Sequence, residues 1–242
     1  GGFMQKKNSV LSDVINAGEL RHNALIWFGA GVSISEILTG TYFAPLGFEK
    51  GLLAIFTGHF IGCVLFFLAG LIGAKTGKSA METVKISFGS KGACLFSVLN
   101  IVQLAGWTIV MILAGSSGCA SVFGSGFEFL WIAFIGLLIV VWVAVDVHKF
   151  DRLNMAAFLL LFVLSVVLCI TIFKKEINTE TVCTSAEVLS FGAAVELAVA
   201  MPLSWLPLAA DYTKNAQKPV LVSGVSAAVY FITSCWMYFI GI

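Results

Sequence analysis

Long apolar runs alternate with short polar segments along the whole chain. A membrane-spanning helix needs about 20 mostly apolar residues. By that measure the pattern predicts seven spans, at 23–44, 51–74, 92–123, 129–145, 153–173, 188–210 and 219–242. No polar segment between them is long enough to form a soluble domain. The sequence therefore predicts an all-α integral membrane protein, a transmembrane domain over 23–242 preceded by the segment 1–22.

Composition agrees with the apolar pattern. Hydrophobic residues make up 59% of the chain and charged residues 11%, with a mean hydropathy of +1.00, against roughly 25% charged residues in an average soluble domain. The net charge of +1 and the lack of a dense basic run argue against a nucleic-acid partner. The six cysteines are scattered without CxxC or Cys/His spacing, so neither a disulfide framework nor a metal cluster is indicated.

Lysine and arginine are distributed unevenly between the two sides of the predicted membrane domain. If the N-terminus is cytoplasmic, the inner segments carry Lys6, Lys7, Arg21, Lys75, Lys78, Lys85, Lys91, Lys149, Arg152, Lys214 and Lys218. The outer segments then carry only Lys50, Lys174 and Lys175. An excess of positive residues marks the cytoplasmic side. We therefore expect a multi-pass protein of the cell membrane with residues 1–22 in the cytoplasm, and the amphipathic segment 76–90 along the inner surface.

The first span begins as an apolar helix and then becomes polar. Gly29 and Gly31 lie within one turn, and Ser33, Ser35 and Glu36 follow. Glycine weakens a helix by about 1 kcal/mol relative to alanine. Unwound backbone at membrane depth is tolerated only where its polar groups find a partner or line a cavity. The pattern is typical of a binding site, but equally of close helix packing on small residues.

The sixth span carries the second irregularity. Pro202 and Pro207 each remove a backbone donor, and Ser204 and Trp205 lie between them. A single proline often only kinks a membrane helix, whereas two around a Ser-Trp pair favour a real break. The first and sixth spans cross the membrane in opposite directions. Interrupted helices in corresponding positions of two inverted halves indicate a transporter with its site near the membrane midplane.

Three stretches carry a family resemblance: GAGVSISEILTG in the first span, QLAGWTIVMILAG in the third, and AADYTKNA after the sixth. They resemble the nucleobase–cation symport-1 family, which includes cytosine permease and the hydantoin and allantoin transporters. The subgroup most similar to this chain is that of hydroxymethylpyrimidine permeases, whose substrate is a thiamine precursor.

The resemblance implies a leucine-transporter-like bundle of twelve helices, with two inverted five-helix repeats and broken helices 1 and 6. On that template the chain holds the first repeat, 23–173, and the start of the second, 188–242. We therefore expect a truncated protein that lacks the eighth helix, which completes the sodium site in the family.

The resemblance also assigns roles in the first span. It implies that the backbone carbonyls of Gly29 and Val32 are ligands for a sodium ion, and that Ser33 contacts substrate. Oxygen ligands suit a hard cation such as sodium. No cofactor is implied beyond the coupling ion, which is sodium or a proton.

In the third span, the resemblance makes Trp107 an aromatic platform for a flat heterocycle. Stacking on an aromatic side chain is worth about 1–3 kcal/mol per base. Gln103 lies one helical turn away on the same face and can both donate and accept hydrogen bonds. The alternative is that Trp107 faces lipid or packs in the core.

The remaining candidates lie in or near the sixth span. Ser204 and Trp205 are the polar and aromatic candidates there, with Leu203 as a packing wall. Glu36 and Glu196 are carboxylates at membrane depth, where ionisable groups are usually functional. Glu196 is a candidate for pairing with an aminopyrimidine, and both are candidates for coupling. Alternatively each caps a neighbouring helix or faces a wet vestibule. His59, in the second span, is interpreted as a packing histidine.

Together these features predict a secondary active symporter that imports a small nucleobase-like heterocycle, hydroxymethylpyrimidine or cytosine, by alternating access. Its partners would be that substrate, the coupling cation and the lipid bilayer. The alternative is a non-transporting membrane protein, either an embedded enzyme or a scaffold on the same bundle. Neither HExxH nor GxSxG occurs in the sequence, so we predict that the protein is not an enzyme.

Overall fold

A computed structural model describes residues 18–124, 126–144, 151–174 and 189–242. Within these residues the chain is helical and contains no strand. Most of the predicted N-terminal segment 1–22 lies outside the described residues, and its end, from residue 18, already belongs to the first helix. The segments 145–150 and 175–188 also lie outside the described part.

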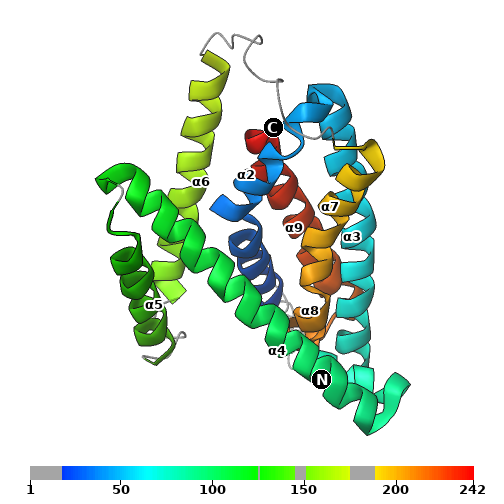
Figure 1. Cartoon of the computed structure of the whole chain (residues 1–242). Coiled ribbons are helices and arrows are strands. Elements are labelled where there is room, and N and C mark those ends of the chain that lie inside the picture. The colour runs from blue at the N-terminus through cyan, green and yellow to red at the C-terminus, as the bar shows by residue number, and fades with distance from the viewer. Residues whose placement is uncertain (1–17, 125, 145–150, 175–188) are drawn as a thin grey trace, which may run out of the picture.

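The helices follow the predicted spans closely (Figure 1). They are the N-terminal helix Gly18–Gly31, α2 (Ile34–Thr41), the 3-10 turn η1 (Ala44–Leu46), α3 (Phe48–Thr76), α4 (Ala80–Phe123), α5 (Glu128–Ala144), α6 (Asp151–Lys174), α7 (Phe191–Ser204), α8 (Leu206–Thr213) and α9 (Pro219–Gly241).

The number of full spans is lower than the seven predicted. Within the described residues, five helices are long and apolar enough to cross a membrane, and the bent pair Gly18–Gly31 and Ile34–Leu46 makes a sixth. The remaining predicted span, 129–145, corresponds to α5. Its 17 residues rise only about 25 Å, which is short of the roughly 30 Å hydrocarbon core.

The first span is interrupted where the sequence predicts. The N-terminal helix ends with the Val32 amide donating to the Phe28 carbonyl at 2.9 Å. Ser33 is extended (φ −141°, ψ 151°), and its side chain accepts a hydrogen bond from the Glu36 amide as the N-cap of α2. The two halves are bent by 46°. The interruption is therefore a genuine break between two helices.

The sixth span is interrupted less than predicted. Trp205 separates α7 from α8 but keeps helical dihedrals (φ −89°, ψ −11°), and Phe191–Thr213 still qualifies as one span. Pro207 lies in the first turn of α8, where its missing N–H is tolerated. The expected break is thus a one-residue discontinuity, because proline at a helix start costs far less than in its interior.

The core forms around α3, which packs against α7, α8 and α9, while α2 packs against α9. Glycines on α3 allow this close approach. A Cβ on Gly58 would meet the backbone of α7, and one on Gly73 would meet Ala210 of α8. Small residues at such interfaces let membrane helices approach closely.

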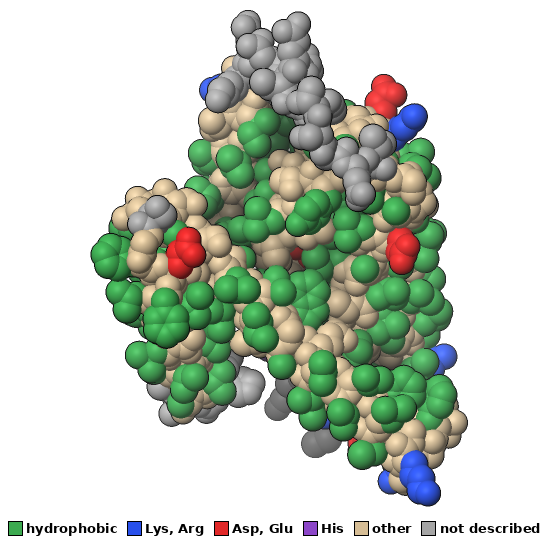
Figure 2. Space-filling model, viewed as in Figure 1, with side chains coloured by type: hydrophobic (Ala, Val, Ile, Leu, Met, Phe, Trp, Pro, Cys, Tyr) green, Lys and Arg blue, Asp and Glu red, His purple; other side chains and the backbone are tan. Residues whose placement is uncertain are grey.

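The helix α4 lies on the outside of this core and runs obliquely across it (Figure 1). It begins with a capping box between Ser79 and Glu82, and Gly89 (φ 66°, ψ −175°) divides a short first part from the long apolar part. The short part lies within the segment 76–90, which the sequence predicts to be amphipathic. Figure 2 shows the face that α4 crosses as largely apolar, with a hollow near its middle.

Candidate functional site

A cavity of about 430 Å³ lies where the first span, the sixth span and α4 meet. Its lining is mostly apolar, with a few polar groups. The lining residues are Ala30, Ser33, Ser35, Glu36, Gln103, Leu104, Trp107, Thr108, Met111, Ile139, Met201, Ser204, Trp205 and Leu208. Small-molecule sites are typically apolar cavities with few polar groups that fix orientation. This is the candidate site.

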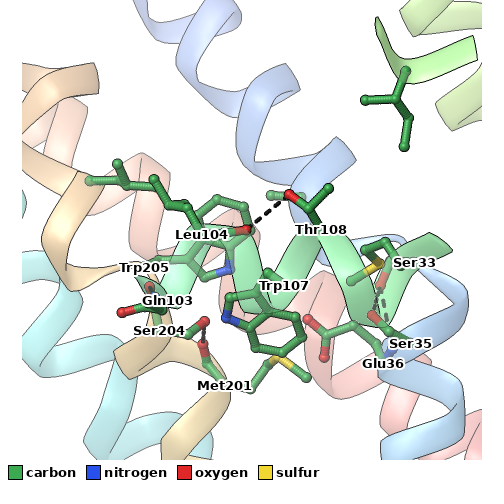
Figure 3. A pocket seen from close by; sticks show the side chains of 14 residues that line it. Ser33, Ser35, Glu36, Gln103, Leu104, Trp107, Thr108, Met201, Ser204 and Trp205 are labelled. Carbon is green, nitrogen blue, oxygen red and sulfur yellow. Dashed lines mark hydrogen bonds between the residues drawn. The ribbon is translucent and has the colours of Figure 1, made fainter. Parts of the chain in front are cut away.

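Two tryptophans give the cavity its aromatic surface. Trp107 comes from α4 and Trp205 from the discontinuity between α7 and α8. Figure 3 shows their indole rings close to each other in the cavity, with the Glu36 carboxylate beyond Trp107. Both side chains are only partly buried, so each has surface left to offer a flat ring.

Gln103 connects α4 to the interrupted sixth span. Around the discontinuity, the Leu208 amide donates to the Trp205 carbonyl at 3.0 Å, one residue short of the α-helical partner. The Ser204 carbonyl instead accepts a hydrogen bond from the Gln103 side-chain amide at 2.5 Å. A buried carbonyl without a donor is costly. The amide nitrogen of Gln103 is therefore already bound to the Ser204 carbonyl, while the Gln103 side chain still lines the cavity.

Glu36 is the acidic residue among those lining the cavity and is almost fully buried, at 2% exposure. Tyr230 donates a hydrogen bond to its Oε1 at 3.0 Å, and Ser234 lies 2.7 Å from its Oε2. Both partners come from α9. The Trp205 indole N–H donates to the Tyr230 hydroxyl at 3.1 Å. The wall of the cavity is thus tied to the carboxylate through Tyr230.

The cavity brings together six of the residues predicted from the sequence to contact substrate or couple transport: Ser33, Glu36, Gln103, Trp107, Ser204 and Trp205. Leu203 is not part of the lining. Glu196 is also outside it, with its side chain exposed on α7. The cavity is therefore built without these two side chains.

The predicted ion ligands lie beside the cavity, at the break in the first span. Val32 is buried at 2% exposure, and Gly29 packs against the Phe158 ring of α6. The regular helix ladder ends with the Val32 amide. In the described part of the chain, the Ser33 amide makes no further backbone bond to the Gly29 carbonyl.

Three residues that sequence reasoning did not assign to the site complete it. Tyr230 and Ser234 form hydrogen bonds with the Glu36 carboxylate. In the sequence, only their spacing of four residues, which places them on one face of a helix, could have suggested a shared role. His59 is buried with both ring nitrogens hydrogen-bonded, which fits a packing histidine, yet one of its partners is Ser234. The sequence of one membrane helix does not indicate which residues of a distant helix will pack against it.

The fold and the cavity together define a multi-pass membrane protein with a ligand-sized chamber between interrupted helices. The family model for permeases for cytosine/purines, uracil, thiamine and allantoin matches residues 16–242. The chain belongs to this family. The resemblance seen in the sequence is confirmed at the level of the family, and the membership places the chain among permeases rather than enzymes.

The name of one relative states a substrate class. The chain is 24% identical to the purine-cytosine permease FCY2 of Saccharomyces cerevisiae (strain ATCC 204508 / S288c) over 241 residues, covering 86% of this chain and 42% of the relative. The chain thus spans less than half the length of that relative. No solved structure matches this chain.

Proposed function

We propose that the protein is a secondary active symporter that imports a small, flat nitrogen heterocycle of the nucleobase type. The observation that carries this proposal is the cavity, in which two indoles, a carboxamide, hydroxyls and one carboxylate converge at an interrupted span. Its volume of about 430 Å³ falls within the range of roughly 300–1,000 Å³ usual for small-molecule pockets.

The chemistry of the lining fits such a substrate. A heterocycle stacks on Trp107 or Trp205, and its edge presents donors and acceptors to Ser33, Ser204 and the free half of the Gln103 amide. Purine and cytosine are the substrates in the name of the yeast relative. Cytosine and hydroxymethylpyrimidine are the first two compounds to test, since both carry an amine beside a ring nitrogen.

Transport would proceed by alternating access and be driven by a cation, sodium or a proton. For sodium, the carbonyls of Gly29 and Val32 would supply oxygen ligands at the helix break. The end of the regular hydrogen-bond ladder at Val32 supports this assignment. For a proton, Glu36 is the carboxylate that lines the cavity.

The test of the proposed function is counterflow of radiolabelled nucleobases and hydroxymethylpyrimidine into proteoliposomes that contain the intact protein. We expect uptake of at least one labelled compound into vesicles preloaded with the same unlabelled compound. Uptake with and without a sodium gradient then separates the two cations. Absence of counterflow for the whole panel, with correctly folded protein, would reject the proposal.

We further propose that the N-terminus is cytoplasmic, with the protein in the cell membrane. Lys50 and Lys78 lie near opposite ends of α3 and are both exposed. In a background without native cysteines, Lys50→Cys should react with an impermeant thiol reagent added to intact cells, and Lys78→Cys should react only after lysis. The reverse pattern would invert the orientation.

A further inference from the structure

A buried chain of hydrogen bonds lies behind the cavity and connects Glu36 to a histidine on α3. His59 Nδ1 lies 2.9 Å from the Ile55 carbonyl oxygen. A carbonyl can only accept, so Nδ1 carries a hydrogen. The other ring nitrogen, Nε2, lies 2.7 Å from Ser234 Oγ. The tautomer of His59 is therefore determined by its neighbour within α3.

Ser234 stands between the histidine and the carboxylate. Its Oγ is 2.7 Å from His59 Nε2 and 2.7 Å from Glu36 Oε2. A serine hydroxyl has one hydrogen to donate. If His59 were neutral and Glu36 ionised, both neighbours would be acceptors, and one of the two short contacts would place lone pair against lone pair. Both contacts are hydrogen bonds only when one additional proton is present, on Nε2 or on Oε2.

The second carboxylate oxygen is satisfied without that proton. The Trp205 indole can only donate, so the Tyr230 hydroxyl accepts from it and directs its own hydrogen to Glu36 Oε1. Oε1 is thus an acceptor, and the additional proton belongs to the side of Glu36 that faces Ser234.

Burial favours the state that holds this proton. His59 and Ser234 are completely buried and Glu36 is 2% exposed. In the described part of the chain, no lysine or arginine forms an ion pair with Glu36. An unpaired buried charge is very costly, and a buried ion pair repays its desolvation only partly. With the proton on Oε2, the Glu36 acid donates to Ser234, Ser234 donates to His59 Nε2, and no group is charged.

The other titratable groups around this chain do not compete for the proton. They are Cys63 from α3 and Tyr230, Cys235 and Tyr238 from α9, with the Tyr238 ring edge-on to His59 at 4.7 Å. Thiols and phenols of this kind are neutral at physiological pH. The α4, α7 and α8 side chains that line the cavity bring no ionisable group.

We propose that Glu36, Ser234 and His59 form a binding site for a single proton, which is the coupling ion of the symporter. The inference rests on the proposed function. On release, the O–H bond at Glu36 Oε2 breaks and the proton passes to water entering the cavity, which Glu36 lines. Ser234 then turns its hydrogen from His59 Nε2 to the new carboxylate. Tyr230 connects Glu36 to Trp205 in the aromatic wall of the cavity.

The decisive variant is Glu36→Gln. The introduced carboxamide can donate to Ser234 Oγ through its nitrogen and accept from Tyr230 through its oxygen. The variant therefore reproduces the hydrogen-bond pattern of the proton-loaded site without a dissociable proton. Glu196→Gln makes the same chemical change at a second carboxylate of the membrane domain, which is exposed on α7 and outside the chain of hydrogen bonds. It is the matched control.

In proteoliposomes, we expect Glu36→Gln to lose accumulation of radiolabelled cytosine driven by an inward proton gradient, and to lose less of its cytosine counterflow, which needs no proton release. Glu196→Gln should accumulate cytosine as the unmodified protein does. Gradient-driven accumulation by Glu36→Gln equal to that of the unmodified protein would overturn the proposal. So would loss of accumulation in Glu196→Gln alone.

Infrared spectroscopy tests the site independently of transport. Spectra of purified protein, compared between acidic and alkaline pH, should contain a carboxylic-acid C=O band that disappears in Glu36→Gln and remains in Glu196→Gln. Ser234→Ala should shift the pH midpoint at which this band disappears. This second variant tests the site even if Glu36→Gln does not fold. A band unaffected by Glu36→Gln, or a midpoint unmoved by Ser234→Ala, refutes the site. If no labelled compound is exchanged by the unmodified protein, the proposed function fails while this measurement still judges the proton site.

Discussion

The two interrupted spans meet at the same cavity but are interrupted in different ways. In the first span an extended residue, Ser33, separates two helices bent by 46°. In the sixth span Trp205 keeps helical dihedrals, and the two halves continue as one span. The first therefore changes direction, whereas the sixth changes only its hydrogen-bond pattern.

The difference follows from the residues that cause each interruption. In the first span, Gly31 packs so closely on α9 that a Cβ there would collide with the Thr233 side chain. The end of the first helix is therefore in tight contact with α9 immediately before the break. In the sixth span, Pro207 sits in the first turn of α8, where it fits the helix, and Gln103 takes up the displaced Ser204 carbonyl. Close packing on a neighbouring helix accompanies the first break, and a side-chain hydrogen bond accompanies the second.

The largest expected effect is that of Gly31→Ala. Its new methyl group would overlap Thr233 and press on the Ser234 backbone, so α9 would have to move away. Overpacking costs about 1–3 kcal/mol, and we expect the upper end because backbone is involved. The measurement is thermal unfolding in detergent. Gly106→Ala, where a Cβ would have no neighbour within 4 Å, is the control, and equal midpoints for the two variants would contradict the packing account.

Next in size is the effect of Trp107→Ala on ligand binding. Loss of a stacking surface should weaken cytosine binding by about 1–3 kcal/mol, or roughly five- to 150-fold. Trp107→Phe should retain part of the affinity, because a smaller ring still stacks. Trp131→Ala removes an indole outside the cavity lining and should leave the dissociation constant unchanged. Unaltered binding in well-folded Trp107→Ala would make this tryptophan a packing residue.

A smaller effect is expected for Gln103→Leu. This change removes the donor to the Ser204 carbonyl and should lower the free energy of unfolding by about 1 kcal/mol. Pro207→Ala restores a backbone N–H in the same turn, so we expect the cost of Gln103→Leu to shrink in that background. A double-mutant cycle on unfolding midpoints measures the coupling. Fully additive effects would show that Gln103 does not compensate for the discontinuity.

The smallest expected effect is that of Ser33→Ala. Ser33 Oγ caps α2 by accepting from the Glu36 amide, but the distance is 3.3 Å. N-cap removal costs about 0.5–2 kcal/mol, and a long bond places this one near the lower limit. Ser190→Ala, which removes the corresponding cap of α7 at 3.2 Å, calibrates the measurement. A loss at Ser33 far above that at Ser190 would mean that the cap maintains the bend.

Sequence reasoning was most successful where local chemistry decides the structure. The apolar runs predicted the helices, and the cluster of glycine and serine in 29–35 marked the break in the first span. The family was also recognised from motifs. The helix α5 was counted as a full span because its apolar run is continuous, although the predicted stretch 129–145 is itself shorter than the usual length of about 20 residues.

The partners of Glu36 could not be predicted in the same way. Its hydrogen-bond partners are Tyr230 and Ser234, about 200 residues away in the sequence, and no period or motif connects Glu36 to those positions. The same holds for Gln103, whose amide was assigned to substrate but is half used by Ser204. A hydrogen bond to a partner far along the sequence cannot be predicted from the residue pattern of a single helix.

In this cavity, the residues that set the overall affinity for flat rings differ from those that select one ring over another. The only polar atom of the Trp205 side chain is its indole nitrogen, and its hydrogen is already given to Tyr230. A bound ring therefore meets Trp205 as pure aromatic surface, which accepts any planar molecule of suitable size. Recognition of one base over another is left to the remaining hydroxyl and amide groups. Substitutions at those positions should change which compound is preferred, while a change of Trp205 to another aromatic residue should alter affinity for all of them alike.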